Sequence, residues 1–94
     1  MPSQNGAYEV LLTDGALAAL KKLDKSVRER MKKKLDLLST LRPARTLKKH
    51  PDIWVLEIGD YRALYLIDEK AKTRTVFFIA DHKEYERRYL RMFR

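Results

Sequence analysis

The fold is decided by the stretch IWVLEIGDYRALYLIDEKAKTRTVFFIAD, residues 53–81. In its first run, apolar residues recur at every second position, as they do in a strand with two different faces. Gly59 and Asp60 form a tight-turn pair after this run, and EKAK marks a second turn. The pattern predicts three antiparallel strands over residues 53–59, 61–68 and 73–80.

The residues before this meander begin with a predicted strand and a helix. Residues 7–13 alternate as a strand does. Thr13 or Asp14 is the expected N-cap of the first helix. One apolar face of that helix is predicted from leucines three residues apart: Leu17, Leu20 and Leu23.

A second helix is predicted to follow after a short break at Asp24 and Lys25. Ser26 with Glu29 three residues later is a capping-box pattern, which opens a helix. The Arg42–Pro43 dipeptide is expected to end it. Two helices with so short a join form an antiparallel hairpin. The buried stripe of the second helix is predicted at Val27, Met31, Leu35 and Leu38.

These elements predict an α+β fold in the order β-α-α-β-β-β. Residues 44–52 read as a further short strand or an ordered loop, and residues 82–94 as a short helix or a tail. We expect a sheet of four to five strands with the helical hairpin on one face and the other face partly open. With 94 residues the chain has room for one core, so a single domain is expected over residues 1–94, with a flexible tail at 1–6.

Charge is the most informative part of the composition. The net charge is +8, and residues 21–50 alone hold twelve basic and three acidic residues. Clustered cations attract a polyanion such as RNA or DNA. A solvated helix face and a docking surface for an acidic protein are the two alternative interpretations. No apolar run is long enough to cross a membrane, no signal peptide is evident and cysteine is absent, which favours a cytoplasmic protein.

Most catalytic motifs are missing from the sequence. The three glycines lie far apart, so there is no phosphate-binding loop, and the two histidines without a carboxylate pair give no reason to expect a metal or another cofactor. The remaining inventory of Arg, Lys, His and Tyr suits RNA cleavage without a metal. In that reaction the ribose 2′-OH attacks its own phosphate, side chains move protons, and cations stabilise the transition state.

The segment WVLEIGDYRALYLIDEKAKTRTVFFIADHKEYERRY resembles the RelE/ParE superfamily of toxins from type II toxin–antitoxin systems. The preceding TLKKH and the helical region are similar too, so the resemblance covers residues 7–89. It implies a RelE-like fold, a twisted and mainly antiparallel sheet packed on a helical hairpin.

The resemblance also implies two kinds of activity. RelE-like members cut mRNA in the ribosomal A site, whereas ParE-like members bind DNA gyrase, and both are neutralised by an antitoxin. We expect the RelE-like activity, an endoribonuclease that inhibits translation on the ribosome and forms a hetero-oligomer with its antitoxin. A gyrase inhibitor, or an inactive protein that binds only its antitoxin, are the alternatives.

The family's functional residues map onto several positions of this chain. The resemblance assigns phosphate binding to Arg62 and proton transfer to His82 or Tyr85, with Tyr89 as the second candidate for the family tyrosine. Lys83 lies beside His82 and completes the catalytic set. RNA binding is expected from Arg45, Lys48, Lys49, Arg87 and Arg88, the last two of which could instead bind the antitoxin.

Each of these residues also has a structural interpretation. Arg62 could pair with Glu57, Asp60 or Asp81, His82 could be a surface or capping residue, and the Tyr85 ring could pack against the sheet. Some ribosome-dependent relatives carry lysines on the strand before the turn, where this chain has Val55 and Glu57. Trp54 is expected to pack in the core or at its edge. Whether Glu57 neutralises Arg62 is therefore the question that the structure has to answer.

Overall fold

The computed structural model of the chain describes residues 7–47 and 50–90, the last two of them by their backbone alone. Strands and helices follow the predicted order, and residues 45–47 form the further short strand that was one of the two interpretations of residues 44–52. The strands are β1 (Glu9–Leu12), β2 (Arg45–Leu47), β3 (His50–Ile58), β4 (Tyr61–Asp68) and β5 (Thr73–Asp81). The helices are α1 (Asp14–Lys21), α2 (Lys25–Leu37), α3 (His82–Tyr85) and the π-helix η2 (Glu86–Leu90). The predicted α+β class is confirmed.

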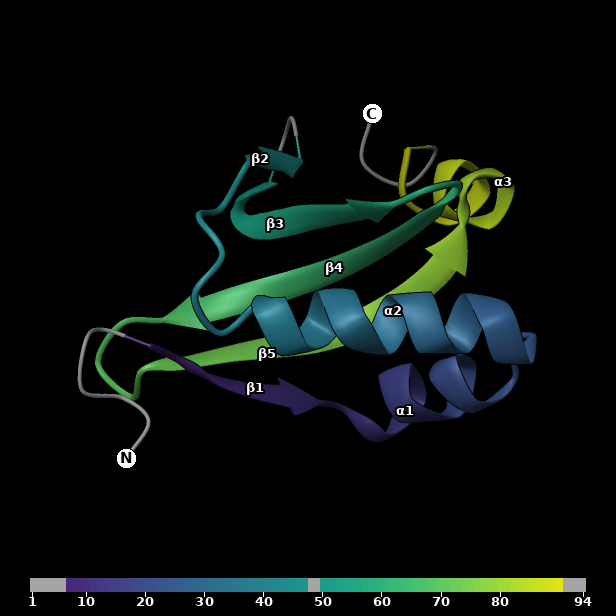
Figure 1. Ribbon diagram of the computed structural model, residues 1–94. Helices are drawn as coiled ribbons and strands as arrows, with labels where there is room; N and C mark the ends of the chain where they lie inside the picture. The colour runs from purple at the N-terminus through teal and green to yellow at the C-terminus, as the bar shows by residue number, and fades with distance from the viewer. Residues whose placement is uncertain (1–6, 48–49, 91–94) are drawn as a thin grey trace.

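The five strands form one sheet in the order β1-β5-β4-β3-β2. The predicted meander is present, because β3, β4 and β5 pair antiparallel in sequence order. β1 joins the sheet beside β5 and runs parallel to it, with Leu12 opposite Val76. The sequence did not predict this parallel contact between the first and last strands, which makes β1 an edge strand of the sheet (Figure 1).

The helical hairpin covers one face of the sheet, as predicted (Figure 1). Met31, Leu35 and Leu38 of the expected stripe are fully or almost fully buried, whereas Val27 is only partly buried. Trp54 packs at the edge of this core, in agreement with the sequence. The core on this face also receives side chains from three strands, namely Leu56, Ile58, Ala63, Tyr65, Val76 and Ile79.

The opposite face is closed at one end and open at the other. A second buried cluster forms there from Leu47, Val55, Leu64 and Tyr85, so the C-terminal segment covers the sheet near the β3–β4 turn. Toward the other end of the sheet, Leu66 on this face is 43% exposed. The expectation of a partly open face therefore holds for the end that α3 does not reach.

The predicted caps of the two long helices had different outcomes. The Thr13 hydroxyl accepts a hydrogen bond from the Ala16 amide at 3.2 Å, as an N-cap residue should. The capping box at Ser26 is wrong, because α2 begins one residue earlier, at Lys25, with Asp24 as its N-cap and no side-chain cap bond.

The predicted apolar face of α1 needs a correction. Leu20 is buried, but Leu17 is 40% exposed, and Ala16 takes the buried position instead. The helix is only two turns long and packs against β5. A leucine one residue beyond the contacting face of so short a helix therefore remains at the surface.

The end of α2 lies before the Arg42–Pro43 dipeptide that was expected to stop it. The helix ends at Leu37, and the buried Arg74 of β5 donates to the carbonyls of Leu38 and Leu41 at 2.7 and 2.6 Å. A guanidinium bonded to these carbonyls satisfies them without further helical turns. This strand cation, which is distant in sequence, therefore fixes the helix end.

The C-terminal segment is helical over the part that the structure describes. Asp81 is the N-cap of α3, and its carboxylate accepts a hydrogen bond from the Glu84 amide at 2.9 Å. The His82 amide donates to the Asp60 carbonyl at 2.7 Å, which ties this helix to the β3–β4 turn. The predicted tail at residues 1–6 lies outside the described residues. No described helix is long and apolar enough to cross a membrane.

Candidate functional site

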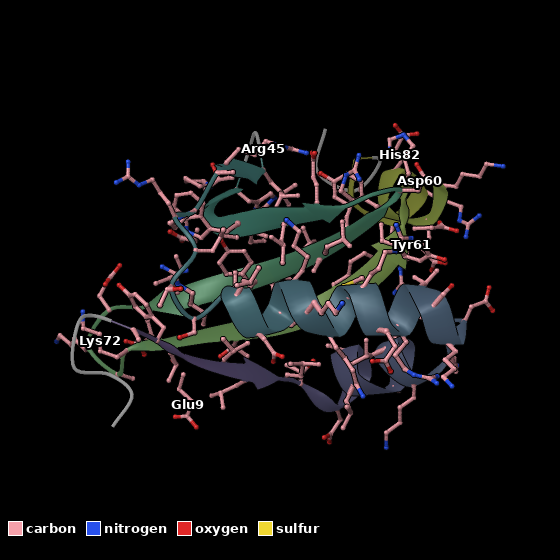
Figure 2. All side chains as sticks on the ribbon, viewed as in Figure 1. Glu9, Arg45, Asp60, Tyr61, Lys72 and His82 are labelled. Carbon is pink, nitrogen blue, oxygen red and sulfur yellow. The ribbon has the colours of Figure 1, made fainter. Side chains whose placement is uncertain are left out.

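The candidate site lies where the β3–β4 turn meets the start of α3. Glu57 and Arg62 are paired across the hairpin, and Ala80 pairs with Arg62 from β5. His82 follows two residues after Ala80, so the strand register brings it to the same end of the sheet. Figure 2 shows Arg45, Asp60 and His82 along one side of the molecule, away from Lys72 and Glu9 at the other end of the sheet.

The turn itself depends on Gly59. Its φ is 58°, in the left-handed region, whereas Asp60 does not have a positive φ, and this is the φ pattern of a type II′ hairpin turn. The Gly59 carbonyl accepts from Arg62 Nη1 at 3.3 Å, and the Tyr61 carbonyl accepts from the same nitrogen at 3.1 Å. The turn backbone therefore holds the guanidinium of Arg62 in place.

Arg62 is the most enclosed cation of the site, with a side chain that is 15% exposed. Its Nη2 lies 3.5 Å from His82 Nδ1, and its Nε lies 3.7 Å from Glu57 Oε2. The Nε is buried and has no hydrogen-bond partner within the described chain. Glu57 is the one described carboxylate within ion-pair distance, so the alternatives of pairing with Asp60 or Asp81 are wrong.

Glu57 interacts more closely with Arg45 than with Arg62. Its Oε2 lies 2.5 Å from Arg45 Nη2, against 3.7 Å for the Arg62 contact. The hydrogen bond from Arg45 lowers the pKa of Glu57, and the same bond raises the pKa of Arg45. One carboxylate is thus shared between two guanidinium groups, which leaves the cluster with a surplus positive charge.

His82 is half exposed and makes contacts through both ring nitrogens. Nδ1 faces Arg62 at 3.5 Å, and Nε2 lies 3.0 Å from Glu86 Oε2, four residues later in the chain. The sequence placed His82 in the candidate site but did not single out Glu86. Its i,i+4 spacing from a histidine in a helical segment was the available signal.

Tyr85 is 4% exposed and packs in the second buried cluster, as its structural interpretation required. Its ring also borders the site, since the Arg62 guanidinium carbon lies 6.0 Å from the ring centroid. Tyr85 further raises the pKa of Arg45, after the larger effect of Glu57. The ring therefore lies beside the Arg62 guanidinium. The side chain of Tyr89, the second candidate, lies outside the described residues.

The remaining predicted residues lie around the cluster. Lys83 is exposed on α3. Arg87 and Arg88 are exposed and pair with Glu84 at 3.6 and 3.4 Å, and neither contacts Arg62. Lys48 and Lys49 fall outside the described residues.

The arrangement combines two functions that a phosphate reaction needs. Guanidinium groups bind a phosphate oxygen pair in a planar fork, and an imidazole beside them can move a proton at neutral pH. Among the described residues, no group of three His, Cys, Asp or Glu side chains is placed to hold a metal ion.

Comparisons with known proteins give a consistent relationship. The family model described as the ParE toxin of the type II toxin–antitoxin system parDE matches residues 10–85. A mutant of the E. coli toxin RelE in the free state is 27% identical, with a TM-score of 0.69 over 85% of this chain and 88% of that chain. A chain of the intact E. coli RelBE complex is 29% identical, with a TM-score of 0.69 over 80% and 96%.

A further similar structure comes from the RelBE2 toxin–antitoxin complex of Mycobacterium tuberculosis. It is 25% identical, with a TM-score of 0.71 over 80% of this chain and 91% of that chain. The comparison with curated protein sequences finds no match. The family model and these structures agree with the fold described above. The chain therefore belongs to the ParE toxin family of type II toxin–antitoxin systems, within the RelE/ParE superfamily.

Proposed function

We propose that this toxin is a metal-independent endoribonuclease that cleaves mRNA in the ribosomal A site and so inhibits translation. The observation that carries the proposal is the contact between Arg62 and His82. A guanidinium fixed by the turn backbone lies 3.5 Å from Nδ1 of the half-exposed His82 imidazole. A phosphate bound by the first group is therefore within reach of the second.

Arg62 and Arg45 are the groups that would bind the phosphate. Each interacts with the Glu57 carboxylate, whose two oxygens resemble two oxygens of a phosphate in size and charge. An incoming phosphodiester would replace this carboxylate on Arg62 and develop further negative charge in its transition state. A cation held in place by two carbonyls stabilises that charge without reorganising.

His82 is the proposed proton carrier. It accepts the 2′-OH proton while the O2′–P bond forms and the P–O5′ bond breaks. The leaving O5′ takes a proton from solvent water, and the imidazolium then returns its proton to solvent, which leaves a 2′,3′-cyclic phosphate and a 5′-hydroxyl on the products. Glu57 is the poorer base, because Arg45 lowers the pKa of its carboxyl group and keeps it ionised but weakly basic. The buried Tyr85 ring packs beside the Arg62 guanidinium. The exposed Lys83 adds a positive charge next to His82 that would attract the RNA.

A cognate antitoxin is the proposed protein partner. The similar structures from E. coli RelBE and Mycobacterium tuberculosis RelBE2 are toxin–antitoxin complexes, and another holds RelE with a RelB peptide. The surplus of basic residues on this chain favours an acidic partner segment. Co-expression with the protein encoded by the adjacent gene should restore growth and yield a complex that copurifies.

The activity is tested by adding purified protein to a translation mixture with a defined mRNA and mapping the new 5′ ends. We expect cleavage at fixed positions within codons. Arg62→Ala should abolish cleavage, and Arg62→Lys should retain little, because lysine keeps the charge but loses the planar fork.

Lys70→Ala provides the matched control. Lys70 is exposed in the β4–β5 turn at the other end of the sheet, and its loss removes one positive charge without touching the site. Circular dichroism of both variants establishes that the fold is kept. Cleavage that survives Arg62→Ala in a folded protein contradicts the assignment of the site.

A gyrase inhibitor without chemistry is the second candidate. Two features favour it, namely the acidic Glu57 on the strand beside Arg62 and the burial of Tyr85. An acidic group repels a phosphate and a buried tyrosine is poorly placed to move a proton, whereas neither feature hinders binding to a protein surface. This function predicts inhibited DNA supercoiling with intact mRNA. A supercoiling assay run with the same protein preparation distinguishes the two activities.

A further inference from the structure

His82 is held from both sides by groups of opposite hydrogen-bonding character. Arg62 faces Nδ1 at 3.5 Å, and Glu86 faces Nε2 at 3.0 Å. A guanidinium only donates hydrogen bonds, and an ionised carboxylate only accepts them. Neutral imidazole carries its proton on one nitrogen and a lone pair on the other.

These two neighbours are compatible with one neutral tautomer. With the proton on Nε2, the ring donates to Glu86, and the Nδ1 lone pair is directed at the N–H groups of Arg62. With the proton on Nδ1, two donors would face each other at Arg62, and a lone pair would face a carboxylate at Glu86. The contacts on both sides therefore favour the Nε2–H form.

We propose that Glu86 is a positioning residue that fixes His82 in the Nε2–H tautomer, with the basic Nδ1 toward the phosphate bound by Arg62. The inference rests on the proposed function of His82 as the proton carrier. It adds a residue that the sequence did not single out and that touches neither RNA nor the phosphate in the proposed arrangement.

The fold provides this pairing through the start of the C-terminal helical segment. Asp81 caps α3, and the His82 amide is bonded to the Asp60 carbonyl, so the histidine backbone is fixed at the turn. Glu86 begins the π-helix η2, four residues after His82. Its carboxylate thereby reaches the far side of the ring from Arg62.

A carboxylate behind the ring also affects the reaction itself. When Nδ1 accepts the 2′-OH proton, the ring becomes an imidazolium, and Glu86 stabilises that charge. The positive charge of Arg62 opposes it, while Glu57 is a second negative group nearby. An orienting carboxylate behind a histidine is a recurring means of setting both its tautomer and its basicity.

The tautomer is measured directly by the imidazole ¹⁵N chemical shifts of labelled protein, at a pH where the ring is neutral. His82→Asn identifies the resonances, since the chain has only two histidines. We expect the Nε2–H pattern for the unmodified protein and for Glu86→Gln, which keeps an acceptor oxygen. Glu86→Ala should shift the ring toward a mixture of the two tautomers.

Kinetics provides the second readout. Glu86→Ala should lower kcat for mRNA cleavage by about tenfold to a hundredfold at an unchanged KM, the scale on which outer orienting groups act. Glu86→Gln should restore part of that loss. In a His82→Ala background, Glu86→Ala should have no further effect, because Glu86 acts only through the ring.

Glu84→Ala is the matched control. It removes one carboxylate from the same segment, and its partners are Arg87 and Arg88 instead of His82. Equal kcat values for Glu84→Ala and Glu86→Ala, or an unmodified protein with the proton on Nδ1, would overturn the inference. An inactive unmodified protein overturns the proposed function instead, and the tautomer of the same samples still decides the role of Glu86.

Discussion

At the scale of single residues, the position of Arg62 follows from the turn that precedes it. The guanidinium donates to two carbonyls of the turn, at Gly59 and Tyr61, and its Nε lacks a hydrogen bond within the described chain. A guanidinium that shares one carboxylate with Arg45 can still attract a second anion. Arg62 is thus held by the backbone and only partly neutralised by Glu57.

Glu57→Gln tests whether the carboxylate competes with the substrate phosphate. Removing the charge frees Arg45 and Arg62, so KM for RNA should fall several-fold, while kcat should change little because His82 moves the proton. Steady-state cleavage kinetics with the Glu57→Gln and Glu69→Gln variants measures this, with Glu69 as an exposed carboxylate in the β4–β5 turn. Loss of activity in Glu57→Gln alone would identify Glu57 as the base.

The same residue predicts a dependence of stability on pH. Folding lowers the pKa of Glu57, so its ionised form stabilises the fold above the ordinary carboxyl range, and this contribution disappears as the pH falls through the lowered value. Both partners are about half exposed, so the effect should be about 1 kcal/mol or less. Urea unfolding should show wild type more stable than Glu57→Gln at pH 7, with no difference at low pH.

At the scale of elements, α3 positions His82, the proposed proton carrier, through its N-cap and one bond to the β3–β4 turn. The Asp81 carboxylate accepts from the Glu84 amide, and the helix is only four residues long before it continues as η2. So short a helix has few internal bonds, and its placement therefore depends on the cap and on the bond between His82 and Asp60.

Asp81→Ala should destabilise the protein by about 1 kcal/mol, the usual cost of losing an N-cap. It should also lower cleavage activity, because the helix carries His82. Asp36→Ala is the control, since Asp36 is exposed inside α2 and caps nothing. Equal urea midpoints for the two variants would mean that the cap does not hold the helix.

The sequence predicted the elements that depend on local pattern. The alternation in β3 and the turn at Gly59 are local, and so is the Thr13 cap. The parallel pairing of β1 with β5 and the end of α2 at Arg74 depend on partners far away in the chain, which no local pattern encodes. The family resemblance supplied Arg62 and His82 as candidates. The contact between these two residues, and the contact between His82 and Glu86, could be found only from the folded structure.

At the scale of the whole molecule, basic residues extend from the site onto α2. The Arg30 guanidinium lies beside the β3–β4 turn, 3.5 Å from the point that a side-chain carbon on Gly59 would occupy. Lys33 and Lys34 are exposed further along the same helix. Basic residues thus continue from the β3–β4 turn onto α2, and clustered cations of this kind favour binding of a polyanion.

This distribution predicts a strong dependence of RNA binding on salt. The logarithm of the binding constant for a single strand should fall linearly with the logarithm of salt concentration, by about 0.7 for each phosphate contacted. Arg62→Ala should reduce the slope by about one contact, whereas Lys70→Ala should leave it unchanged. Fluorescence anisotropy between low and physiological salt concentrations measures the slope. A binding constant that does not change with salt would contradict an electrostatic role of the basic residues.

In the proposed reaction of Arg62 and His82, the nucleophile is the 2′-hydroxyl of the RNA next to the cleaved phosphate. A suitable substrate is an mRNA with one 2′-deoxynucleotide on the 5′ side of the mapped cleavage position, presented to the toxin on ribosomes. We expect this mRNA to stay intact, while the all-ribose mRNA is cut to a 2′,3′-cyclic phosphate and a 5′-hydroxyl. Cleavage of the deoxy-substituted mRNA, or intact ribose mRNA together with inhibited supercoiling, would contradict the proposed reaction.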